Sequence, residues 1–176
     1  DYALCYTGPE PSVPVSDLSA GAIVAWNAAS GRIVLPDGRT AVLPAGIWLS
    51  LENWKQRSVS HADSVLTTAA GFSGRPYLWG GTSGKGMDCS GFTKTVYFLL
   101  GQIIPRDASQ QVFAGEPVVW NKDFSGLMPG DFLFFGNYRP DGSRRISHVG
   151  IYTGNGRFIH SGADNGSIRE QSLRQG

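Results

Sequence analysis

The sequence has few charged residues and no long apolar run. Asp, Glu, Lys and Arg make up 16% of its 176 residues, against roughly 25% in an average soluble protein. The 15 basic and 14 acidic side chains leave a net charge of +1, which is too balanced for the basic surface of a nucleic-acid-binding protein. No apolar run approaches the roughly 20 residues that cross a bilayer. We therefore expect no nucleic-acid partner and no membrane span.

Cysteine is also scarce. Cys5 and Cys89 could form one disulfide, but a chain of this length does not need such a link and the two contexts differ. Asp1 opens the chain without the basic and apolar segments of a signal peptide, so we expect no targeting segment in these residues. Glycine (24 residues) and aromatic residues (11%) are plentiful instead. This composition favours a folded chain with one large domain, or a small domain followed by a medium one.

The first third of the chain predicts a small β-structure. Residues 1–17 carry Pro9, Pro11 and Pro14 and no periodic pattern, so an irregular lead-in is expected. From Asp17 to Trp54, the short apolar runs AIVAW, RIVL, TAVL and IWLSL alternate with turn signals such as Asp37-Gly38. Closely spaced short strands of this kind are typical of an SH3-like barrel. We assign residues 1–56 to the lead-in and barrel.

Residues 57–176 predict helices followed by strands. A helix is expected over 58–70 with its cap at Ser58 or Ser60, and a second one over 89–100, ended by Gly101. A short helix over about 107–113 follows. The runs DFLFFG, ISHVGIYT and GRFIHSG are then predicted strands, and GRFIHSG is the last of them. Helices first and an antiparallel sheet afterwards indicate an α+β fold.

Cys89 lies where a Gly-rich loop meets a predicted helix, in GMDCSGF. Unpaired backbone N–H groups at a helix start stabilise a thiolate, which is the form of cysteine that acts as a nucleophile. A buried, inert thiol is the commoner fate of a free cysteine. The polar neighbours Asp88 and Ser90 argue against such an apolar site, so we favour a nucleophile.

A cysteine nucleophile needs a general base, and two of the three histidines lie on adjacent predicted strands. His148 and His160 share a face of the sheet only if the register is right. A two-residue turn at Asn155-Gly156 would pair His160 with Ile151 and turn it away from His148. A three-residue loop from Gly154 would put both imidazoles on one face, unless a bulge intervenes. Catalysis therefore predicts the three-residue loop.

The expected roles are Cys89 as nucleophile, His148 as proton carrier and His160 as the group that orients His148. His61 is interpreted as a surface residue of the linker helix. A zinc site is the rival use of the same side chains, but neither a CxxC pair nor HExxH is present, so we expect no metal.

Four blocks in order along the chain resemble the NlpC-type papain-like peptidases of bacterial cell-wall peptides: YLWGGTSGKGMDCSGF, IPRDASQQ, LMPGDFLFFG and SHVGIYTGNGRFIHSG. They span 77–162, about half of the chain. The preceding barrel resembles the bacterial SH3-like domain of such enzymes. The resemblance implies a papain-like domain at 57–176 and a thiol endopeptidase without cofactor. Its bond would lie between γ-D-glutamate and a diamino acid, meso-diaminopimelate or Lys, in murein stem peptides.

The resemblance also implies roles for individual residues. Cys89, His148 and His160 would form the catalytic triad, and Tyr77 would help to polarise the carbonyl beside the Cys89 backbone N–H. The recycling-type members recognise a free N-terminal L-Ala-γ-D-Glu through acidic and hydroxyl groups. The substrate-binding positions that match are Asp88, Ser90, Arg106 and Asp107, with Trp79 as a wall of the cleft.

Alternatives stay open for several of these assignments. Arg106 and Asp107 could instead form a mutual surface ion pair and a helix cap. Ala108 stands where many relatives carry a hydroxyl residue, so one substrate hydrogen bond would be absent. The whole chain could be an amidase or a non-catalytic cell-wall-binding module. By resemblance we expect a monomer of the bacterial envelope, periplasmic or exported, with a cytoplasmic recycling role as the alternative.

Overall fold

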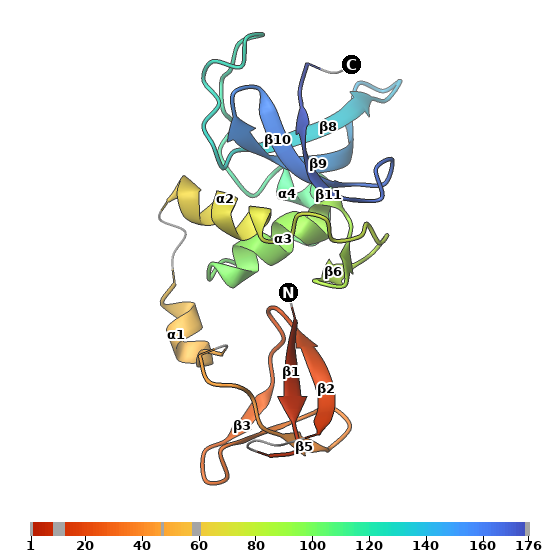
Figure 1. Cartoon of the computed structure of the whole chain (residues 1–176). Coiled ribbons are helices and arrows are strands. Elements are labelled where there is room, and N and C mark those ends of the chain that lie inside the picture. Colours follow the sequence, from red (N-terminus) through yellow and green to blue (C-terminus); the bar gives the residue numbers. More distant parts are fainter. Residues whose placement is uncertain (1, 9–12, 47, 58–60, 175–176) are drawn as a thin grey trace.

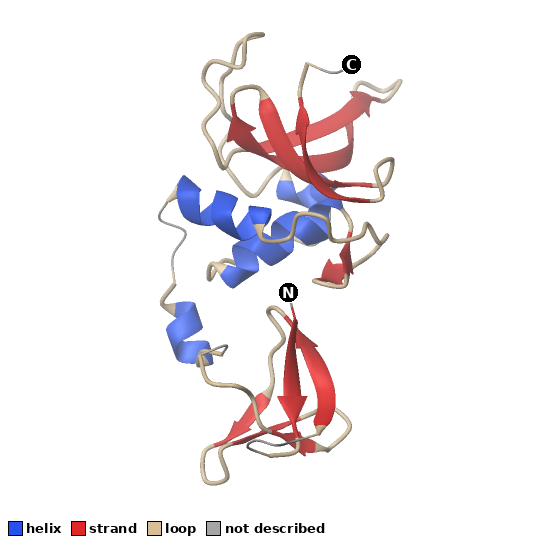
Figure 2. Cartoon of the chain, in the orientation of Figure 1, coloured by secondary structure: helices blue, strands red, loops and turns tan. Residues whose placement is uncertain are grey.

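The structure, a computed structural model, describes residues 2–8, 13–46, 48–57 and 61–174. Two parts follow one another along the chain (Figure 1). The N-terminal part comprises the described residues up to Arg57 and is mostly strands, whereas the C-terminal part begins at His61 and carries helices and a sheet. Figure 2 shows the helices of the C-terminal part between its sheet and the strands of the N-terminal part. The fold is therefore mixed α and β.

The N-terminal part contains two small antiparallel sheets. One consists of β1 (Tyr2–Tyr6) and β2 (Pro14–Ser19), and the other of β3 (Ala25–Asn27), β4 (Arg32–Val34) and β5 (Thr40–Ala41). A bridge between Tyr6 and Val42 joins them. The buried residues they share are Cys5, Ile33, Leu35 and Ala41.

Two predictions for this part were wrong. The lead-in 1–17 is not irregular, because it holds β1 and most of β2; Pro14 is the first residue of its strand, where the missing N–H is tolerated. The run IWLSL forms no strand over its described residues. The Ser50 hydroxyl instead accepts a hydrogen bond from the Asn53 N–H and caps α1 (Leu51–Lys55), so local capping decides the structure here.

The helices of the C-terminal part match the sequence pattern closely. Helix α2 (Ala62–Ala70) begins after His61, and the expected caps Ser58 and Ser60 lie outside the described residues. The hairpin of β6 (Thr82–Ser83) and β7 (Gly86–Met87) leads into α3 (Cys89–Leu99). Gly101 follows α3 with a φ of 90°, as expected for a residue that ends a helix. The short helix is α4 (Ala108–Gln111).

An antiparallel sheet of four strands packs on these helices, in the order β11-β10-β9-β8. Its strands are β8 (Phe132–Tyr138), β9 (Arg144–Gly154), β10 (Arg157–Gly162) and β11 (Ser167–Ser172). Strand β11 was not predicted, because SIREQS has a single buried apolar residue, Ile168, and otherwise looks like a polar loop. The core between helices and sheet contains Val65, Ala69, Phe72, Met87, Phe92, Val96, Ile151, Ile159 and Ile168.

The N-terminal part is attached to the C-terminal end of α3. The Trp54 indole N–H donates to the Phe98 carbonyl (2.6 Å) and the Arg57 guanidinium donates to the Leu99 carbonyl (2.9 Å). The Phe98 carbonyl also accepts from the Gly101 N–H (3.0 Å), so the indole adds a second bond there, whereas the Leu99 carbonyl is among the last carbonyls of the helix, which have no partner within it. An ion pair between Lys85 Nζ and Asp17 (2.6 Å) adds a second link. Among the described residues, no helix has both the length and the apolar character to cross a membrane.

Candidate active site

Cys89 is the first residue of α3, and the residue before it determines where that helix begins. The Asp88 carboxylate accepts a hydrogen bond from the Gly91 N–H (2.7 Å) and caps the helix. Cys89 itself is half-buried. Burial raises the pKa of its thiol, and hydrogen bonding from the backbone of Val149 and Ser90 only partly offsets this. The expected backbone groups are present, but the loss of solvent outweighs them.

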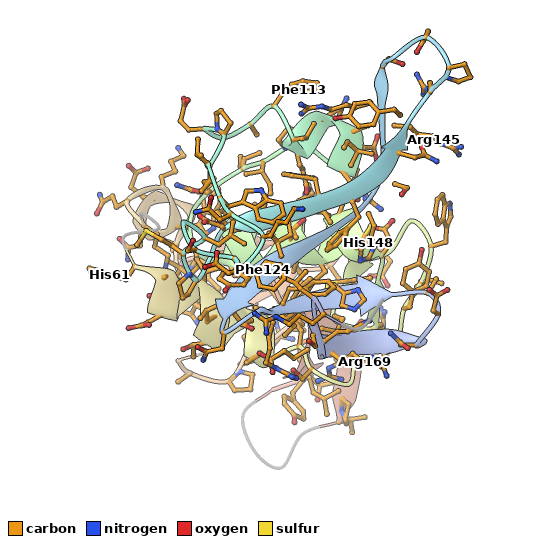
Figure 3. All side chains as sticks on the ribbon, turned by 90° about the horizontal axis from the view of Figure 1, so that it is seen from above. His61, Phe113, Phe124, Arg145, His148 and Arg169 are labelled. Atoms are coloured by element: carbon orange, nitrogen blue, oxygen red, sulfur yellow. The ribbon has the colours of Figure 1, made fainter. Side chains whose placement is uncertain are left out.

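His148 on β9 and His160 on β10 contact each other through their rings. His148 Nε2 lies 2.8 Å from His160 Nδ1, and the other ring nitrogen of His160, Nε2, lies 3.0 Å from Gln171 Oε1 on β11. Burial, followed by the neighbouring His160, lowers the pKa of His148 to about 4. Burial also lowers the pKa of His160. Both imidazoles are thus neutral at pH 7. Figure 3 shows His148 on the sheet.

The turn that brings the histidines together differs from the predicted one. Arg157 pairs with Gly154, so the loop has two residues, Asn155 (φ 53°) and Gly156 (φ 69°), and the three-residue loop was wrong. The register then shifts, and Ile159 pairs with Ile151. A bulge at Thr153 causes this shift and restores the register that places both imidazoles on one face.

Asp88 and Arg106 form an ion pair at the start of α3. Arg106 Nη2 lies 2.6 Å from Asp88 Oδ2, and Arg106 Nη1 donates to Asp88 Oδ1 (3.1 Å) and to the Ser90 hydroxyl (2.8 Å). Burial opposes ionisation of Asp88, but hydrogen bonds from Arg106 and the Gly91 N–H prevail and keep the pKa of Asp88 below its usual range. The alternative of an Arg106–Asp107 surface pair was wrong, since Arg106 pairs with Asp88. Asp107 is exposed and precedes α4 without a side-chain capping bond.

Gln111 is a buried polar residue that sequence reasoning missed. Its amide donates to the Ser90 carbonyl (3.1 Å) and the Pro105 carbonyl (2.9 Å), and its oxygen accepts from the Thr93 hydroxyl (2.8 Å). These bonds tie the start of α3 to the segment that carries Arg106. A glutamine in a short polar helix gives no signal of this role. Gln171 was missed for a different reason, because its strand, β11, was not predicted.

Tyr77 lies close to the nucleophile. Burial raises the pKa of its hydroxyl, and electrostatic interactions with Cys89 and Asp88 add to the effect. The hydroxyl is therefore a hydrogen-bond donor at neutral pH. Trp79, two residues on, is 86% exposed. Gly80, next in the same loop, donates its N–H to Asp88 Oδ2 (3.0 Å).

The remaining candidates lie apart from this group. His61 is exposed at the start of α2, as expected of a surface residue. Cys5 is buried in the N-terminal part, where its thiol donates to the Ser16 carbonyl, and both cysteines are free. Within the described part of the chain, no three or more His, Cys, Asp and Glu side chains gather as a metal site would require.

Known proteins are similar to this chain in both sequence and fold. The model of the NlpC/P60 family matches residues 74–176. A gamma-D-glutamyl-L-lysine dipeptidyl-peptidase of Bacillus cereus is 36% identical over 90% of this chain and 47% of its own length. One of the same name from Bacillus subtilis is 41% identical over 65% of this chain and 36% of its own length. The chain thus spans less than half of each of these relatives.

The solved structures that are similar to this chain belong to the same family as these sequence relatives. An NlpC/P60 family protein from Bacillus cereus superposes with a TM-score of 0.77 at 32% identity, over 99% of this chain and 56% of its own. The NlpC/p60 domain of the peptidoglycan hydrolase SagA gives a TM-score of 0.56 at 33% identity, over 65% of this chain and 91% of its own. The family model covers more than half of the sequence and includes Cys89, His148 and His160. The chain belongs to the NlpC/P60 family.

Proposed function

We propose that this chain is a cysteine peptidase that cleaves peptidoglycan stem peptides between γ-D-glutamate and the diamino acid. The observation that carries the proposal is the thiol at the start of α3, which accepts a hydrogen bond from the backbone of Val149, next to His148 in a hydrogen-bonded pair of neutral imidazoles. The names of the two Bacillus relatives, gamma-D-glutamyl-L-lysine dipeptidyl-peptidases, support this choice of bond.

The reaction proceeds through a thioester. His148 takes the proton of the Cys89 thiol as the sulfur attacks the γ-glutamyl carbonyl carbon. The carbonyl oxygen becomes negative and is held by the Cys89 N–H, which has no helical acceptor at the first position of α3, and by the Tyr77 hydroxyl. The C–N bond breaks as the imidazolium returns its proton to the leaving amine. Water, deprotonated by His148, then attacks the thioester. The C–S bond breaks, the imidazolium returns its proton to the Cys89 sulfur, and the product acid leaves.

The charged groups beside Cys89 suit the glutamyl residue. Arg106 makes two hydrogen bonds to Asp88 and one to Ser90. Its remaining N–H donors, together with the Ser90 hydroxyl, are proposed to hold the substrate α-carboxylate. Asp88 is already paired, so the exposed Asp107 is the better candidate for the free ammonium of N-terminal L-Ala. Trp79 is proposed as a wall of the cleft.

We infer a papain-like catalytic domain at 57–176 and an SH3-like domain at 1–56. The helix that carries the thiol, packed on the sheet that carries the histidines, supports the first assignment. The five short strands around Cys5 and Ile33 support the second. A monomer with an envelope or exported location is proposed from cell-wall relatives such as the probable peptidoglycan endopeptidase LytE of Bacillus subtilis.

Mass spectrometry of cleavage products tests the function. The substrates are L-Ala-γ-D-Glu-L-Lys and L-Ala-γ-D-Glu-meso-diaminopimelate, each with and without an N-acetyl group, and Cys89→Ala is the control. We expect release of the free diamino acid from the unblocked peptides only, and none with Cys89→Ala. Equal cleavage of acetylated peptides would overturn the role of Asp107. If neither peptide is cleaved and the protein co-sediments with purified sacculi, the chain is a cell-wall-binding module and the proposed peptidase activity is wrong.

A further inference from the structure

Gln171 occupies a position on β11 that points at the histidine pair. Its neighbour two residues earlier, Arg169, pairs with His160 across the two strands, and the side chains at 169 and 171 share a face. Figure 3 labels Arg169 and His148 on this sheet. Gln171 Oε1 lies 3.0 Å from His160 Nε2, on the side of the ring away from His148. The contact is therefore at the far end of the His148–His160 pair, and the Cys89 thiol lies at its near end, against the backbone of Val149, the residue after His148.

The chemistry of the amide oxygen decides which nitrogens carry protons. A carbonyl oxygen only accepts, so His160 Nε2 must be protonated and, in a neutral ring, His160 Nδ1 must accept. That nitrogen faces His148 Nε2 at 2.8 Å, so His148 Nε2 donates. His148 Nδ1 is then the unprotonated nitrogen, which is the one that can take the thiol proton. With the opposite tautomers, His148 Nδ1 would hold a hydrogen and could not act as a base.

A second donor holds the amide of Gln171 in this orientation. Asn165, in the turn before β11, donates from Nδ2 to the same oxygen at 3.5 Å. Reversal of the Gln171 amide would set an NH₂ group against the Asn165 NH₂ group. The carbonyl oxygen is thus kept toward the His160 ring.

We propose that Gln171 is a positioning residue that selects the Nε2–H tautomer of His160 and thereby leaves Nδ1 of His148 free to act as the base. This inference rests on the proposed function for its catalytic consequence. The tautomers themselves can be measured without any substrate.

The other groups around the two rings explain why an uncharged acceptor suits this place. Asp164 favours protonation of both rings, Arg169 opposes protonation of His160, and the Cys89 thiol lies against the backbone that follows His148. The remaining neighbours are apolar rings, Phe158 stacked on His160 and Phe135 beside His148. A carboxylate at 171 would add a second negative charge and favour the imidazolium, whereas the amide fixes the tautomer and leaves the base neutral.

Nuclear magnetic resonance of the ¹⁵N-labelled chain tests the proposal, because ring nitrogen shifts distinguish the two tautomers. For the wild type at pH 7 we expect His148 and His160 both as Nε2–H. Gln171→Leu should move one or both rings toward Nδ1–H, and Gln171→Glu should keep Nε2–H. If Gln171→Leu does not fold, Gln171→Asn replaces it, since its oxygen is withdrawn by one methylene. An Nδ1–H His160 in the wild type, or unchanged tautomers in the folded variant, would overturn the proposal.

Kinetics with the unblocked tripeptides provide the second measurement. Gln171→Leu should lower kcat on the order of ten- to a hundredfold with little change in KM, which is at or below the roughly 10²–10⁴-fold that general-base catalysis contributes in full, because only the orientation of the base is lost. Gln171→Glu should retain most of the wild-type kcat. It should also move the acid limb of the pH profile to higher pH, because the added carboxylate favours the imidazolium. Gln102→Leu, the same change at an exposed position after α3, is the control. Equal rates for Gln171→Leu and the wild type would refute the catalytic consequence. Absence of any wild-type cleavage would instead refute the proposed function, and the nitrogen shifts would still decide the tautomer.

Discussion

The proposed nucleophile and base are both uncharged in the resting protein. Burial raises the pKa of the Cys89 thiol and lowers that of His148, so each change favours the neutral form. The helix start alone would favour a thiolate. Transfer of the proton during attack, rather than a preformed thiolate–imidazolium pair, is the mechanism that these directions support.

The reactivity of Cys89 toward a small electrophile reports this state directly. We expect the rate of alkylation by iodoacetamide to rise continuously with pH and to keep rising above about 8.5, the usual pKa of a cysteine, because burial raises the pKa of this thiol. A preformed ion pair would instead give a plateau from pH 5 to 8, as its pKa values would lie outside that window. Peptide mass spectrometry separates Cys89 from the buried Cys5, which should stay unmodified in the folded chain.

The acid limb of the pH profile follows from the pKa of His148. This pKa is lowered to about 4, so the imidazole stays neutral and able to accept a proton well below the usual value for histidine. Activity is therefore retained as the pH falls through 6.5 and is lost only near pH 4. The measurement is kcat/KM against pH for the unblocked tripeptides. A limb near 6.5 would contradict the buried, neutral imidazole.

Removal of Arg106 should destabilise the protein as well as the site. Arg106→Ala leaves the carboxylate of Asp88 without its counter-ion at the start of α3. We expect a loss of about 2–3 kcal/mol in the free energy of unfolding, less than for a fully buried pair because the Arg106 side chain is 32% exposed. Arg106→Lys should lose less, since it keeps the charge but not the two-pronged contact. Urea denaturation measures both, with exposed Arg144→Ala as the control.

At the scale of elements, the hairpin of β9 and β10 depends on a close approach of its two strands. A Cβ on Gly150 would lie 2.6 Å from the Phe158 ring, 3.1 Å from the Ile159 carbonyl oxygen and 3.2 Å from the His160 Cβ. Gly150 lies between His148 and Tyr152 on the strand and opposite His160 in the shifted register. This glycine therefore lets the two imidazoles meet.

Gly150→Ala should accordingly separate the histidines. We expect a loss of about 1–3 kcal/mol in the free energy of unfolding, the usual cost of an overpacked site, and a fall in kcat larger than a global loss of folded protein explains. Thermal melts and kinetics on the same preparation measure the two effects. Gly115→Ala, at a glycine with open space around it and no positive φ, should change neither. Wild-type kcat in Gly150→Ala would show that the strands can separate without harm.

The sequence predicted the elements that carry strong local signals. Asp88 and Gly101 bound α3, and two apolar strands flank Asn155-Gly156, so the positions of Cys89 and both histidines were predictable. Strands β1 and β11 were not predictable. Prolines follow β1, and β11 is mostly polar, so neither segment shows an alternating apolar pattern, and each becomes a strand only by pairing with its neighbour. The bulge at Thr153 and the partner of Arg106 depend on contacts between distant segments, which no local pattern contains.

At the scale of the molecule, the two parts are joined through the end of α3. The Trp54 indole N–H and the Arg57 guanidinium donate to the carbonyls of Phe98 and Leu99. The Trp54 ring also packs 4.8 Å from the Phe98 ring. The N-terminal part thus contacts the same helix that begins with Cys89, and its attachment depends on a small number of side chains.

Trp54→Phe should loosen this attachment. The phenyl ring keeps the packing but loses the N–H bond, at a cost of about 1 kcal/mol. The Arg57 contact to the Leu99 carbonyl lies next to the bond that is lost, so Arg57 should detach more often in this variant. We therefore expect trypsin to cleave after Arg57 faster than in the wild type. Mass spectrometry of timed digests measures the rate. Trp120→Phe is the matched control, and equal cleavage of Trp54→Phe and wild type would show that the indole bond does not hold the junction.

Helix α3 also restricts how the length of this chain can vary between relatives. It holds the thiol at one end and the N-terminal part at the other, and the helix between them is eleven residues, or about 16 Å, long. One inserted residue would turn one end by about 100° relative to the other and lengthen the helix by about 1.5 Å. A loop can absorb an inserted residue, but this helix cannot. Homologous chains that keep both attachments should therefore tolerate gaps between α4 and β8 and have none between Cys89 and Leu99.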